Sequence, residues 1–433
     1  MDRLGRRSVY YDKQFSLKFV YCNKQCYIRV KNETMDSLFD RQIEYLTDVP
    51  MSFTRRMMDV IDWDSRLVII RGPKGVGKST LMQQYILKNY EPMDRKVLYC
   101  SADTAYFASH TLIETASEFV KHGGRHLFLD EIHKYGNWSR EVKEIHDLYK
   151  GLRVVLSGSS LLHINDGQSD LSRRADVYDM PGLSFREYLW FKTGNETEPV
   201  SLAELLARPN DLCLKVRGIC RPLEYFSDYL SSGYYPFSFE KKKTYRKLIE
   251  NVTNYIIENE LTECRGVSIA IKGMLQVISS MLPYLVDMSK LSKSVSIDRV
   301  TLLKYLKYLD EAKLIRCLYT ELDKITDLQK PEKILMDNTN LLYTFSMKEP
   351  EIGTVRETFF CNQLSSAGHV VEYGGMKTGD FRIDGQNVIE VGGAGKDYYQ
   401  IDDDDIGNAA LAVDNIEIAN GKRIPLWAFG FLY

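Results

Sequence analysis

Short apolar runs alternate with longer stretches of helical periodicity between residues 60 and 182. The runs are rich in Val, Ile and Leu and too short to be helices, so they predict buried strands. The predicted strands cover residues 67–70, 97–100, 126–129, 153–157 and 177–180. The predicted helices between them cover residues 79–90, 111–122 and 139–150. Such alternation is typical of an α/β fold in which helices cover a parallel sheet.

The pattern changes on both sides of this segment. Before it, residues 35–46 have the periodicity of a helix that begins at Met35. After it, residues 184–263 are helical, and residues 265–320 are helical until they end in a short β-prone run. Beyond residue 330, strand and helix patterns alternate again. The aromatic tail, residues 424–433, predicts a buried terminal strand.

The length and composition indicate a globular protein with more than one core. At 433 residues the chain exceeds one ordinary core, so about two to four domains are expected. A hydrophobic content of 44% allows cores of normal size. The changes of pattern predict an extension over 1–34, an α/β domain over 35–183, a helical lid over 184–263, a mostly helical segment over 264–320 and a second α/β domain over 321–433.

Charge is informative only at the N-terminus. The net charge of −2 gives the whole chain no attraction to nucleic acid. Residues 1–34, however, carry eight Lys and Arg against three Asp and Glu. A basic arm that touches nucleic acid is one interpretation. A poorly ordered or strand-forming extension is the interpretation we favour, and Met35 is a candidate for the true start.

Cysteine usage predicts a reducing compartment. The eight cysteines show no CxxC pair, and the spacing of Cys22 and Cys26 has no second half that would complete a metal site. No long apolar segment suggests a signal peptide or a membrane span. We therefore expect a cytoplasmic protein with free, mostly buried thiols and no membrane partner.

One segment matches the phosphate-binding P-loop pattern GxxxxGK[ST] in full. It follows a predicted strand and begins a predicted helix, which is the structural context that the pattern requires. Glycines let backbone N–H groups face the β-phosphate, and the helix adds its positive N-terminus. We expect Lys78 to neutralise the β- and γ-phosphates and Ser79 to hold Mg²⁺. The ATP-binding residues are predicted to be Gly72, Pro73, Lys74, Gly75, Val76, Gly77, Lys78, Ser79 and Thr80.

An acidic pair ends the third predicted strand. Residues 126–129 form the mostly apolar run of a predicted strand, and Asp130 and Glu131 follow directly. At the carboxyl edge of a parallel sheet these side chains would lie beside the P-loop. Asp130 is then the candidate to order Mg²⁺ through water. Glu131 is the candidate general base that polarises the attacking water.

Two further segments offer candidates for contact with the γ-phosphate. Ser157 and Ser159 follow the fourth strand, where a hydroxyl can sense the phosphate or the lytic water; simple turn chemistry is the alternative. Arg174 precedes the fifth strand and is the candidate arginine finger for a neighbouring subunit, with Arg173 as the fallback. A solvated surface pair is the competing explanation for these arginines.

Three runs carry a family resemblance. They are Leu-Asp-Glu-Ile-His-Lys-Tyr-Gly-Asn-Trp at 129–138, Val-Leu-Ser-Gly-Ser-Ser at 155–160, and Arg-Ala-Asp-Val-Tyr-Asp-Met-Pro-Gly-Leu-Ser-Phe-Arg-Glu-Tyr at 174–188. From Met35 to its end the chain resembles prokaryotic AAA-type ATPases that carry a C-terminal domain of unknown function. The resemblance implies ATPase roles for the P-loop, Asp130, Glu131 and Arg174. The family's glycine before that arginine is Arg173 here.

The same resemblance implies a winged-helix-like segment before the last domain. Residues 288–309, followed by the β-prone run 314–319, can be parsed as helix, turn, helix and wing. Its basic residues could contact the phosphates of double-stranded DNA. The leucines of the second helix instead describe a core face, and winged helices also bind proteins. The candidate phosphate contacts are Lys290, Lys293, Arg299, Lys304 and Lys307.

The last domain resembles the restriction-endonuclease-like fold. Nucleases of that fold hold Mg²⁺ with acidic residues and use a lysine beside them. The corresponding positions here are Glu357, Asp380 and Glu390, and Gly392 stands where the lysine is expected. Lys396 is the nearest substitute. The missing lysine favours a domain that does not cut nucleic acid. The acidic run 402–405 is interpreted as a solvated loop rather than an ion site.

Three functions are compatible with these features. The first is an ATP- and Mg²⁺-dependent AAA-type switch or motor that acts as a homo-oligomer on DNA or on a protein partner. The second is a nuclease regulated by ATP, which Gly392 disfavours. The third is a nucleotide-binding signalling scaffold, which Glu131 disfavours because slow turnover requires no positioned base.

Overall fold

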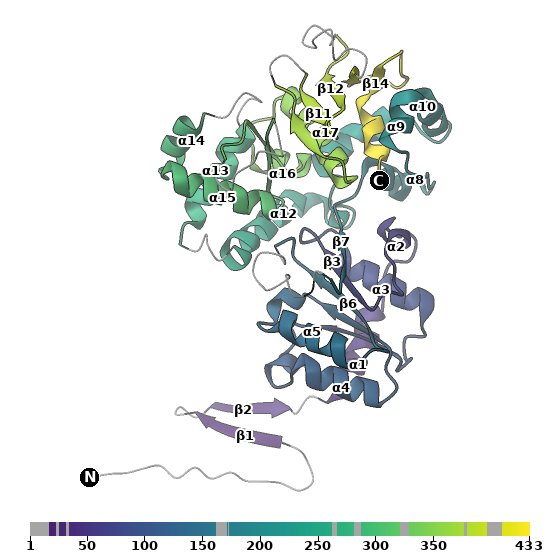
Figure 1. Cartoon of the computed structure of the whole chain (residues 1–433), viewed down its shortest axis with the longest axis vertical. Helices are drawn as coiled ribbons and strands as arrows, with labels where there is room; N and C mark the ends of the chain where they lie inside the picture. Colours follow the sequence, from purple (N-terminus) through teal and green to yellow (C-terminus); the bar gives the residue numbers. More distant parts are fainter. Residues whose placement is uncertain are drawn as a thin grey trace, which may run out of the picture.

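The computed structural model describes residues 34–161, 171, 173–261, 266–280, 287–320, 329–375, 379–395 and 409–433, together with the backbone of 17–22 and 26–31. Figure 1 shows two lobes, with the first large sheet in the lower lobe and the C-terminal sheet in the upper lobe. Strands β1 (Leu17–Cys22) and β2 (Cys26–Lys31) form an antiparallel hairpin. The extension therefore forms strands at these residues, while the rest of the basic arm lies outside the described residues.

The lower lobe is built on five parallel strands. They are β3 (Leu67–Arg71), β4 (Val97–Ser101), β5 (His126–Asp130), β6 (Arg153–Gly158) and β7 (Asp176–Asp179), in the spatial order β4-β5-β6-β3-β7. All four pairings are parallel. The predicted parallel sheet is confirmed, with strand ends shifted by one residue at most.

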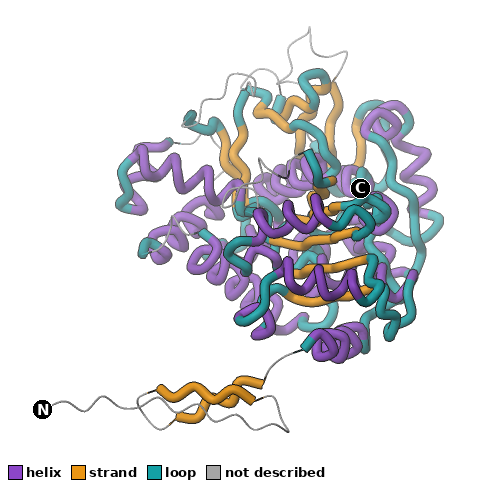
Figure 2. The backbone as a smooth tube through the Cα atoms, turned by 60° about the horizontal axis from the view of Figure 1, so that its bottom comes forward, coloured by secondary structure: helices purple, strands orange, loops and turns teal. Residues whose placement is uncertain are grey.

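Helices cover both faces of this sheet (Figure 2). They are α1 (Met35–Leu46), α2 (Met57–Val60), α3 (Lys78–Asn89), α4 (Leu112–Lys121) and α5 (Trp138–Leu148). Val68 and Ile70 pack in one core with Leu81 of α3. Leu67 and Ile69 point to the other face, into a core that contains α4 and α5. Successive residues of β3 therefore point to opposite faces of the sheet, and helices cover the apolar side chains on each face.

Helices then lead from the lower lobe to the upper one. The first group is α8 (Phe185–Thr193), α9 (Leu202–Ala207), α10 (Pro209–Arg217), α11 (Pro222–Ser232), the 3-10 turns η3 (Pro236–Ser238) and η4 (Lys242–Thr244), α12 (Tyr245–Tyr255) and the π-helical turn η5 (Ile256–Glu260). The second group is α13 (Ser268–Ser280), α14 (Met288–Val295), α15 (Arg299–Glu311) and α16 (Thr339–Phe345). Strands β8 (Ile315–Leu318) and β9 (Lys333–Met336) pair antiparallel between α15 and α16.

A second five-stranded sheet forms the upper lobe. Its strands are β10 (Val371–Tyr373), β11 (Phe381–Ile383), β12 (Asn387–Gly392), β13 (Ala409–Val413) and β14 (Arg423–Pro425), in sequence order. The first three strands are antiparallel and the last three are parallel. Helix α17 (Ile352–Ser366) packs on the sheet, with Phe360 and Phe381 at a ring-centroid distance of 5.3 Å.

The C-terminal tail differs from the prediction. After Pro425 the chain forms a 3-10 helix, η9 (Leu426–Phe431), so a terminal strand over 424–433 is wrong beyond β14. Its burial was predicted correctly, because Trp427, Phe429 and Phe431 are almost fully enclosed. Pro425 has no N–H for a ladder and ends the pairing. Alternating aromatic residues can thus be buried without forming a strand.

The two lobes share one hydrophobic core. Phe185, from α8, makes edge contacts with Phe226 of α11 and with Phe431 of the tail, at 5.1 and 6.2 Å between ring centroids. Phe226 in turn contacts Phe359 of α17 at 4.9 Å. The joint between the lobes is therefore packed with aromatic side chains and not bridged by a solvated linker.

A buried ion pair stabilises the base of this joint. Arg55 Nε lies 2.9 Å from Glu187 Oε2, and the two side chains are 7% and 1% exposed. The guanidinium also donates to the carbonyl oxygens of Val76, Pro181 and Gly182. Burial works to raise the pKa of Glu187, but the positive charges of Arg55 and Arg186 outweigh it and hold the pKa below its ordinary value.

Replacing Glu187 with Gln should destabilise the protein by about 3–5 kcal/mol at pH 7, because Arg55 would keep a buried charge without its partner. A carboxylate with a lowered folded-state pKa stabilises above the unfolded pKa of about 4.3, and this stability is lost as pH falls through the folded value. The gap between wild type and variant should therefore shrink below about pH 4. Urea unfolding at a series of pH values measures it, and a gap that does not change with pH would contradict the assignment.

Among the described residues, Cys100, Cys213, Cys317 and Cys361 are free and buried, and Cys220 is free and half-buried. No helix in the described ranges combines the length and the apolar character that a membrane crossing requires.

Candidate functional site

The P-loop connects β3 to α3, as its sequence context predicted. Gly75 and Gly77 have φ values of +88° and +100°, in the region that glycine adopts without strain. Gly77 immediately precedes α3. A Cβ at Gly72 would lie 2.2 Å from the carbonyl oxygen of Met180, and a Cβ at Gly75 would lie 2.8 Å from Phe237. All three glycines are therefore required by backbone conformation or close packing.

Lys78 is folded back onto the loop. Its Nζ donates to the carbonyl oxygens of Gly72 and Pro73 at 2.8 and 3.0 Å. The side chain is buried, and burial lowers the pKa of Lys78, while the carboxylates of Glu131 and Asp130 act in the opposite direction. A cation held only by neutral carbonyls beside an acidic pair is ready to bind an anionic phosphate.

Asp130 is fixed by its neighbours at the end of β5. Its carboxylate accepts hydrogen bonds from the Tyr99 hydroxyl at 2.6 Å, from the Ser157 hydroxyl and from the Glu131 N–H at 3.0 Å. Strand β6 lies between β3 and β5, so Ser157 stands between the P-loop strand and the acidic pair. Ser157 is fully buried and also accepts from the Glu131 N–H at 3.2 Å. It positions the acidic pair, a role that the sequence did not indicate.

Glu131 has a strained backbone. Its φ and ψ are +52° and +39°, the left-handed region, which costs a non-glycine residue about 1–2 kcal/mol. Such strain at a site persists only where the surroundings hold it, and here Asp130 and Ser157 do so. The turn directs the Glu131 side chain to the cavity that the P-loop borders.

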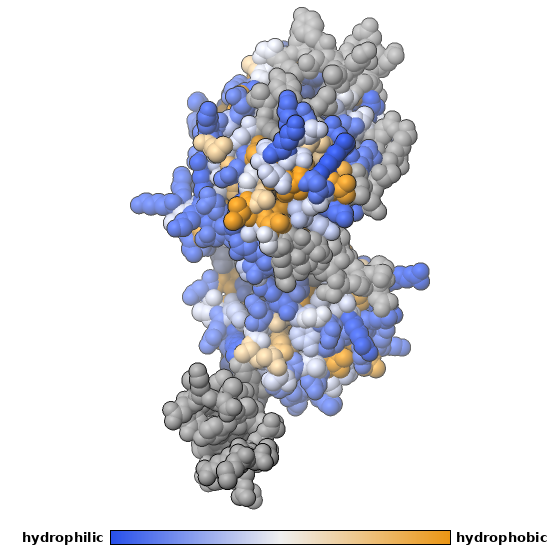
Figure 3. All heavy atoms as spheres, turned by 90° about the vertical axis from the view of Figure 1, so that its left-hand side faces the viewer, coloured by the Kyte–Doolittle hydropathy of each residue, from blue (hydrophilic) through white to orange (hydrophobic). Residues whose placement is uncertain are grey.

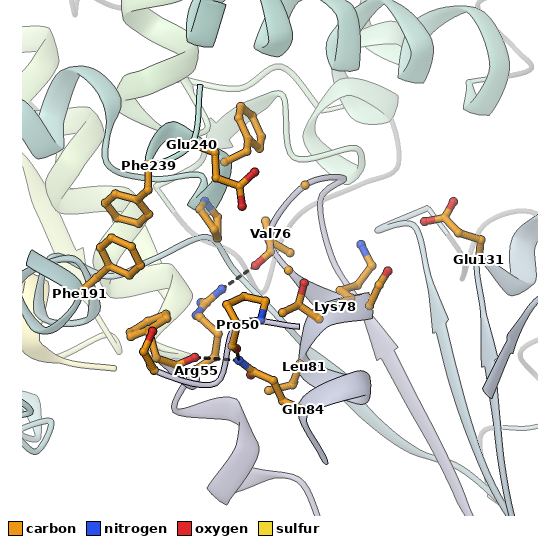
Figure 4. Close-up of a pocket in the computed structure, with 18 residues that line it drawn as sticks. Pro50, Arg55, Val76, Lys78, Leu81, Gln84, Glu131, Phe191, Phe239 and Glu240 are labelled. Atoms are coloured by element: carbon orange, nitrogen blue, oxygen red, sulfur yellow. Dashed lines mark hydrogen bonds between the residues drawn. The ribbon is translucent and has the colours of Figure 1, made fainter. Parts of the chain in front are cut away.

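The cavity at the P-loop has a volume of about 470 Å³. Its lining includes Lys78, Ser79 and Thr80 on one side and aromatic and apolar residues on the other. Phe191 and Phe239 stack with their ring centroids 3.6 Å apart. Figure 4 shows these two rings at one end of the site, Glu131 at the other and Lys78 between them. The sequence did not reveal the apolar wall, which consists of Pro50, Phe53, Phe191, Pro236, Phe237 and Phe239.

The residues at the P-loop fit a Mg²⁺ ion that arrives with a nucleotide. Among the described residues, no three His, Cys, Asp or Glu side chains gather as a metal site. A nucleotide-bound Mg²⁺ needs only one or two protein oxygens beside phosphate and water oxygens. Ser79 borders the cavity, and Asp130 lies at the end of β5, which is separated from the P-loop strand β3 by β6. These are the hard oxygen ligands that Mg²⁺ prefers.

The helical lid also contacts the P-loop and the segments that follow β5 and β6. The Ser159 hydroxyl donates to Glu260 of η5, and the Lys134 ammonium contacts the Tyr255 hydroxyl. The ammonium of Lys74, a P-loop residue, lies 3.8 Å from the centroid of the Tyr255 ring. Tyr255 and Glu260 lie far from the P-loop in sequence and match no motif, so sequence analysis missed them.

Arg174 lies at the amino end of β7, whereas the P-loop follows the carboxyl end of the adjacent parallel strand β3. It therefore stands at the opposite edge of the sheet from the site of its own chain. Its guanidinium binds Asp147 with two contacts of 3.0 and 3.1 Å. The side chain is 30% exposed, and Arg173 is exposed beside it. From this position Arg174 could act as an arginine finger only at the nucleotide site of another subunit.

The segment proposed for DNA contact lies in the upper lobe. Helices α14 and α15 and the pair β8–β9 follow the predicted order of helix, helix and strand. Leu302, Leu306 and Leu309 are buried, as a core face requires. On the side shown in Figure 3, hydrophilic side chains surround a smaller apolar area. The five basic candidates Lys290, Lys293, Arg299, Lys304 and Lys307 are all exposed.

Among the described residues, the acidic nuclease-like set does not gather as a metal site. Asp380 and Glu390 lie on neighbouring chain segments at the start of β11 and in β12, and Asp380 accepts from the Val391 N–H at 2.8 Å. Glu357, on α17, is buried and lies 2.6 Å from the Nζ of Lys333 in β9. Lys333 is a partner that the sequence did not suggest. Lys396 and the run 402–405 lie outside the described residues.

Two family models match the sequence. Residues 64–189 match a family described as an AAA domain. Residues 223–351 match a family described as a domain of unknown function (DUF8612), which runs across parts of the predicted lid, the winged-helix-like segment and the start of the last domain. No curated protein matches the sequence.

Several solved structures resemble parts of the chain. They are PCH-2 of C. elegans (15% identity, 40% of this chain, 47% of that chain, TM-score 0.24), AMPPCP-bound DnaA of Aquifex aeolicus (14%, 57%, 82%, 0.23) and katanin (15%, 36%, 57%, 0.24). The chain thus aligns with about half of the length of PCH-2. TM-scores of this size do not establish a shared overall fold. The family match and the five-stranded parallel sheet together show that residues 64–189 form an AAA domain with a P-loop nucleotide site.

Proposed function

We propose that this chain hydrolyses ATP with Mg²⁺ and works as an oligomeric AAA-type switch or motor on DNA or on a protein partner. The observation that supports hydrolysis, beyond nucleotide binding, is the placement of Glu131. A strained turn directs its carboxylate to the P-loop cavity, and Asp130 and Ser157 hold that turn. A site for binding alone would have no need of a carboxylate held in this costly conformation.

Binding begins with a change of partner at Lys78. Its ammonium leaves the carbonyls of Gly72 and Pro73 for the β- and γ-phosphates, which the loop amides also bind. Phe191 and Phe239 provide a flat apolar wall for the base at the far end of the cavity. ATP would therefore lie with its base on the aromatic wall and its γ-phosphate toward Glu131.

In the chemical step, Glu131 orients a water molecule and accepts its proton as the water oxygen bonds to the γ-phosphorus. The bond between the γ-phosphorus and the bridging oxygen breaks, and ADP carries away the electron pair. Ser79 and Asp130 would hold Mg²⁺, which when bound stabilises negative charge on the phosphates. Arg174 of a neighbouring subunit would add positive charge at the γ-phosphate.

The proposal is tested by phosphate release from ATP, measured with and without double-stranded DNA, together with the mass of the nucleotide-bound assembly. We expect hydrolysis that requires Mg²⁺ and a mass of several subunits when ATP is bound. Acceleration by DNA would identify DNA as a partner, and a DNA-independent rate would favour a protein partner. An assembly that binds ATP and releases no phosphate under either condition would contradict hydrolysis.

A further inference from the structure

The turn η5 places an acidic residue of the lid against the segment that follows β6. Glu260 accepts a hydrogen bond from the hydroxyl of Ser159, the residue just beyond β6. The N–H of Ser159 donates to Nδ1 of His133 at 3.4 Å, and Nε2 of His133 lies 3.5 Å from the Glu131 carboxylate. Glu260 is therefore connected through two residues to the proposed general base.

Lysine ammonium groups lie beside η5, because Lys74 and Lys134 both contact the ring of Tyr255, the last residue of α12. Burial lowers the pKa of His133, and the charge of Glu260 is the main electrostatic influence in the other direction. Burial lowers the pKa of Lys78, and the charge of Glu260 opposes this effect together with those of Glu131 and Asp130. The Lys78 ammonium, which a γ-phosphate would use, is thus partly neutralised by a side chain of the lid. The Glu260 carboxylate resembles part of a phosphate group here, because its negatively charged oxygens accept a hydrogen bond from a hydroxyl and lie near lysine ammonium groups.

From these contacts we propose that Glu260 determines how this site distinguishes ATP from ADP. Its carboxylate binds Ser159 when no γ-phosphate is present, and the γ-phosphate of ATP displaces it by taking over Ser159 and the adjacent cations. ADP has no group at this position and leaves the contact intact. The inference deepens the proposed ATPase function and depends on it.

The lid provides a path by which this displacement reaches the upper lobe. Glu260 ends a π-helical turn that continues directly from α12, and such turns often lie at functional positions. Tyr255, at the end of α12, contacts Lys74 and Lys134 of the lower lobe. At the other end of α12, Arg246 lies 5.8 Å from the ring centroid of Tyr343 in α16. Loss of the Glu260 contact would release one end of a helix whose other end touches the C-terminal half.

The test replaces Glu260 with Gln, which keeps the shape and can still bond Ser159 but removes the charge. Binding of a non-hydrolysable ATP analogue should tighten on the order of ten-fold, because a like charge no longer opposes the γ-phosphate. Binding of ADP should change less than about two-fold. Isothermal titration calorimetry gives both dissociation constants. The matched control is Glu258→Gln, an exposed glutamate of the same turn that pairs with Lys272.

Hydrogen exchange over residues 245–260 provides a second measurement. In the wild type the ATP analogue should increase exchange in this segment and ADP should not. Equal changes for both nucleotides in the Glu260 variant, no change in either, or the same effect from Glu258→Gln would each overturn the inference. A wild type that binds neither nucleotide would instead contradict the proposed function. A variant that binds ADP normally is folded at this site, which excludes misfolding as the cause.

Discussion

Replacing Glu131 with Gln should give a protein that binds ATP and turns it over about 10²–10⁴-fold more slowly than the wild type. The amide keeps the shape of the side chain and cannot accept the proton of the attacking water. The P-loop, Lys78 and the aromatic wall are unchanged, so the affinity for ATP should persist. Phosphate release measures the rate, and nucleotide retained after gel filtration measures the trapped complex.

A matched control for this variant is Glu118→Gln, which makes the same change at an exposed position on α4. It should behave as the wild type. Unchanged turnover in the Glu131 variant would exclude Glu131 as the base. Loss of binding in that variant would instead mean that Glu131 supports the shape of the site, which its strained backbone also allows.

Replacing Arg174 with Ala should slow turnover about 10³-fold or more and leave ATP binding intact, because a finger acts on the charge of the transition state. The structure adds a requirement that the sequence did not show. Arg174 binds the Asp147 carboxylate through two hydrogen bonds, which hold the pKa of Asp147 below its ordinary value. The finger must leave Asp147 before it can reach a neighbouring site.

Mixing two inactive variants tests whether the finger acts between subunits. A Lys78→Ala subunit has a defective P-loop but an intact Arg174, and an Arg174→Ala subunit has the reverse. In a mixed assembly the first should supply its arginine to the second, so the mixture should recover part of the activity that neither variant has alone. Absence of recovery in an assembly shown to contain both would contradict the proposal. Arg173→Ala, at the exposed neighbour, is the control.

The sequence was sufficient for the parts of the site that depend on neighbours along the chain. The apolar runs around Val68 and Phe128 predict strands, and parallel strands bring the P-loop and Asp130 to the same edge of the sheet. The boundaries shifted by one or two residues, because the capping residues determine where a helix begins and ends. Gly77, in the left-handed conformation, lets α3 begin already at Lys78.

The remaining parts depend on contacts between distant segments, which no local pattern encodes. Phe191 and Phe239 each read as one residue of an amphipathic stretch, and only the fold stacks them at the cavity. Ser159 follows a predicted strand, but Glu260 lies 101 residues further on and matches no motif. In the tail, the aromatic spacing of residues 427–431 fits a strand and a 3-10 helix equally well at this length. Packing against α17 and α8, not periodicity, chose between them.

The aromatic joint between the lobes limits which part of the chain can be isolated with its core intact. Phe185, Phe226, Phe359 and Phe431 come from four segments spread over most of the chain, yet they fill one interior. A fragment that ends at residue 189, where the AAA match ends, would keep Phe185 and lose the other three rings. Phe185 and the apolar residues around it would then be in contact with water, and exposed apolar surface of this kind promotes aggregation. The smallest piece that can carry the ATP site in isolation is therefore larger than the AAA domain recognised in its sequence.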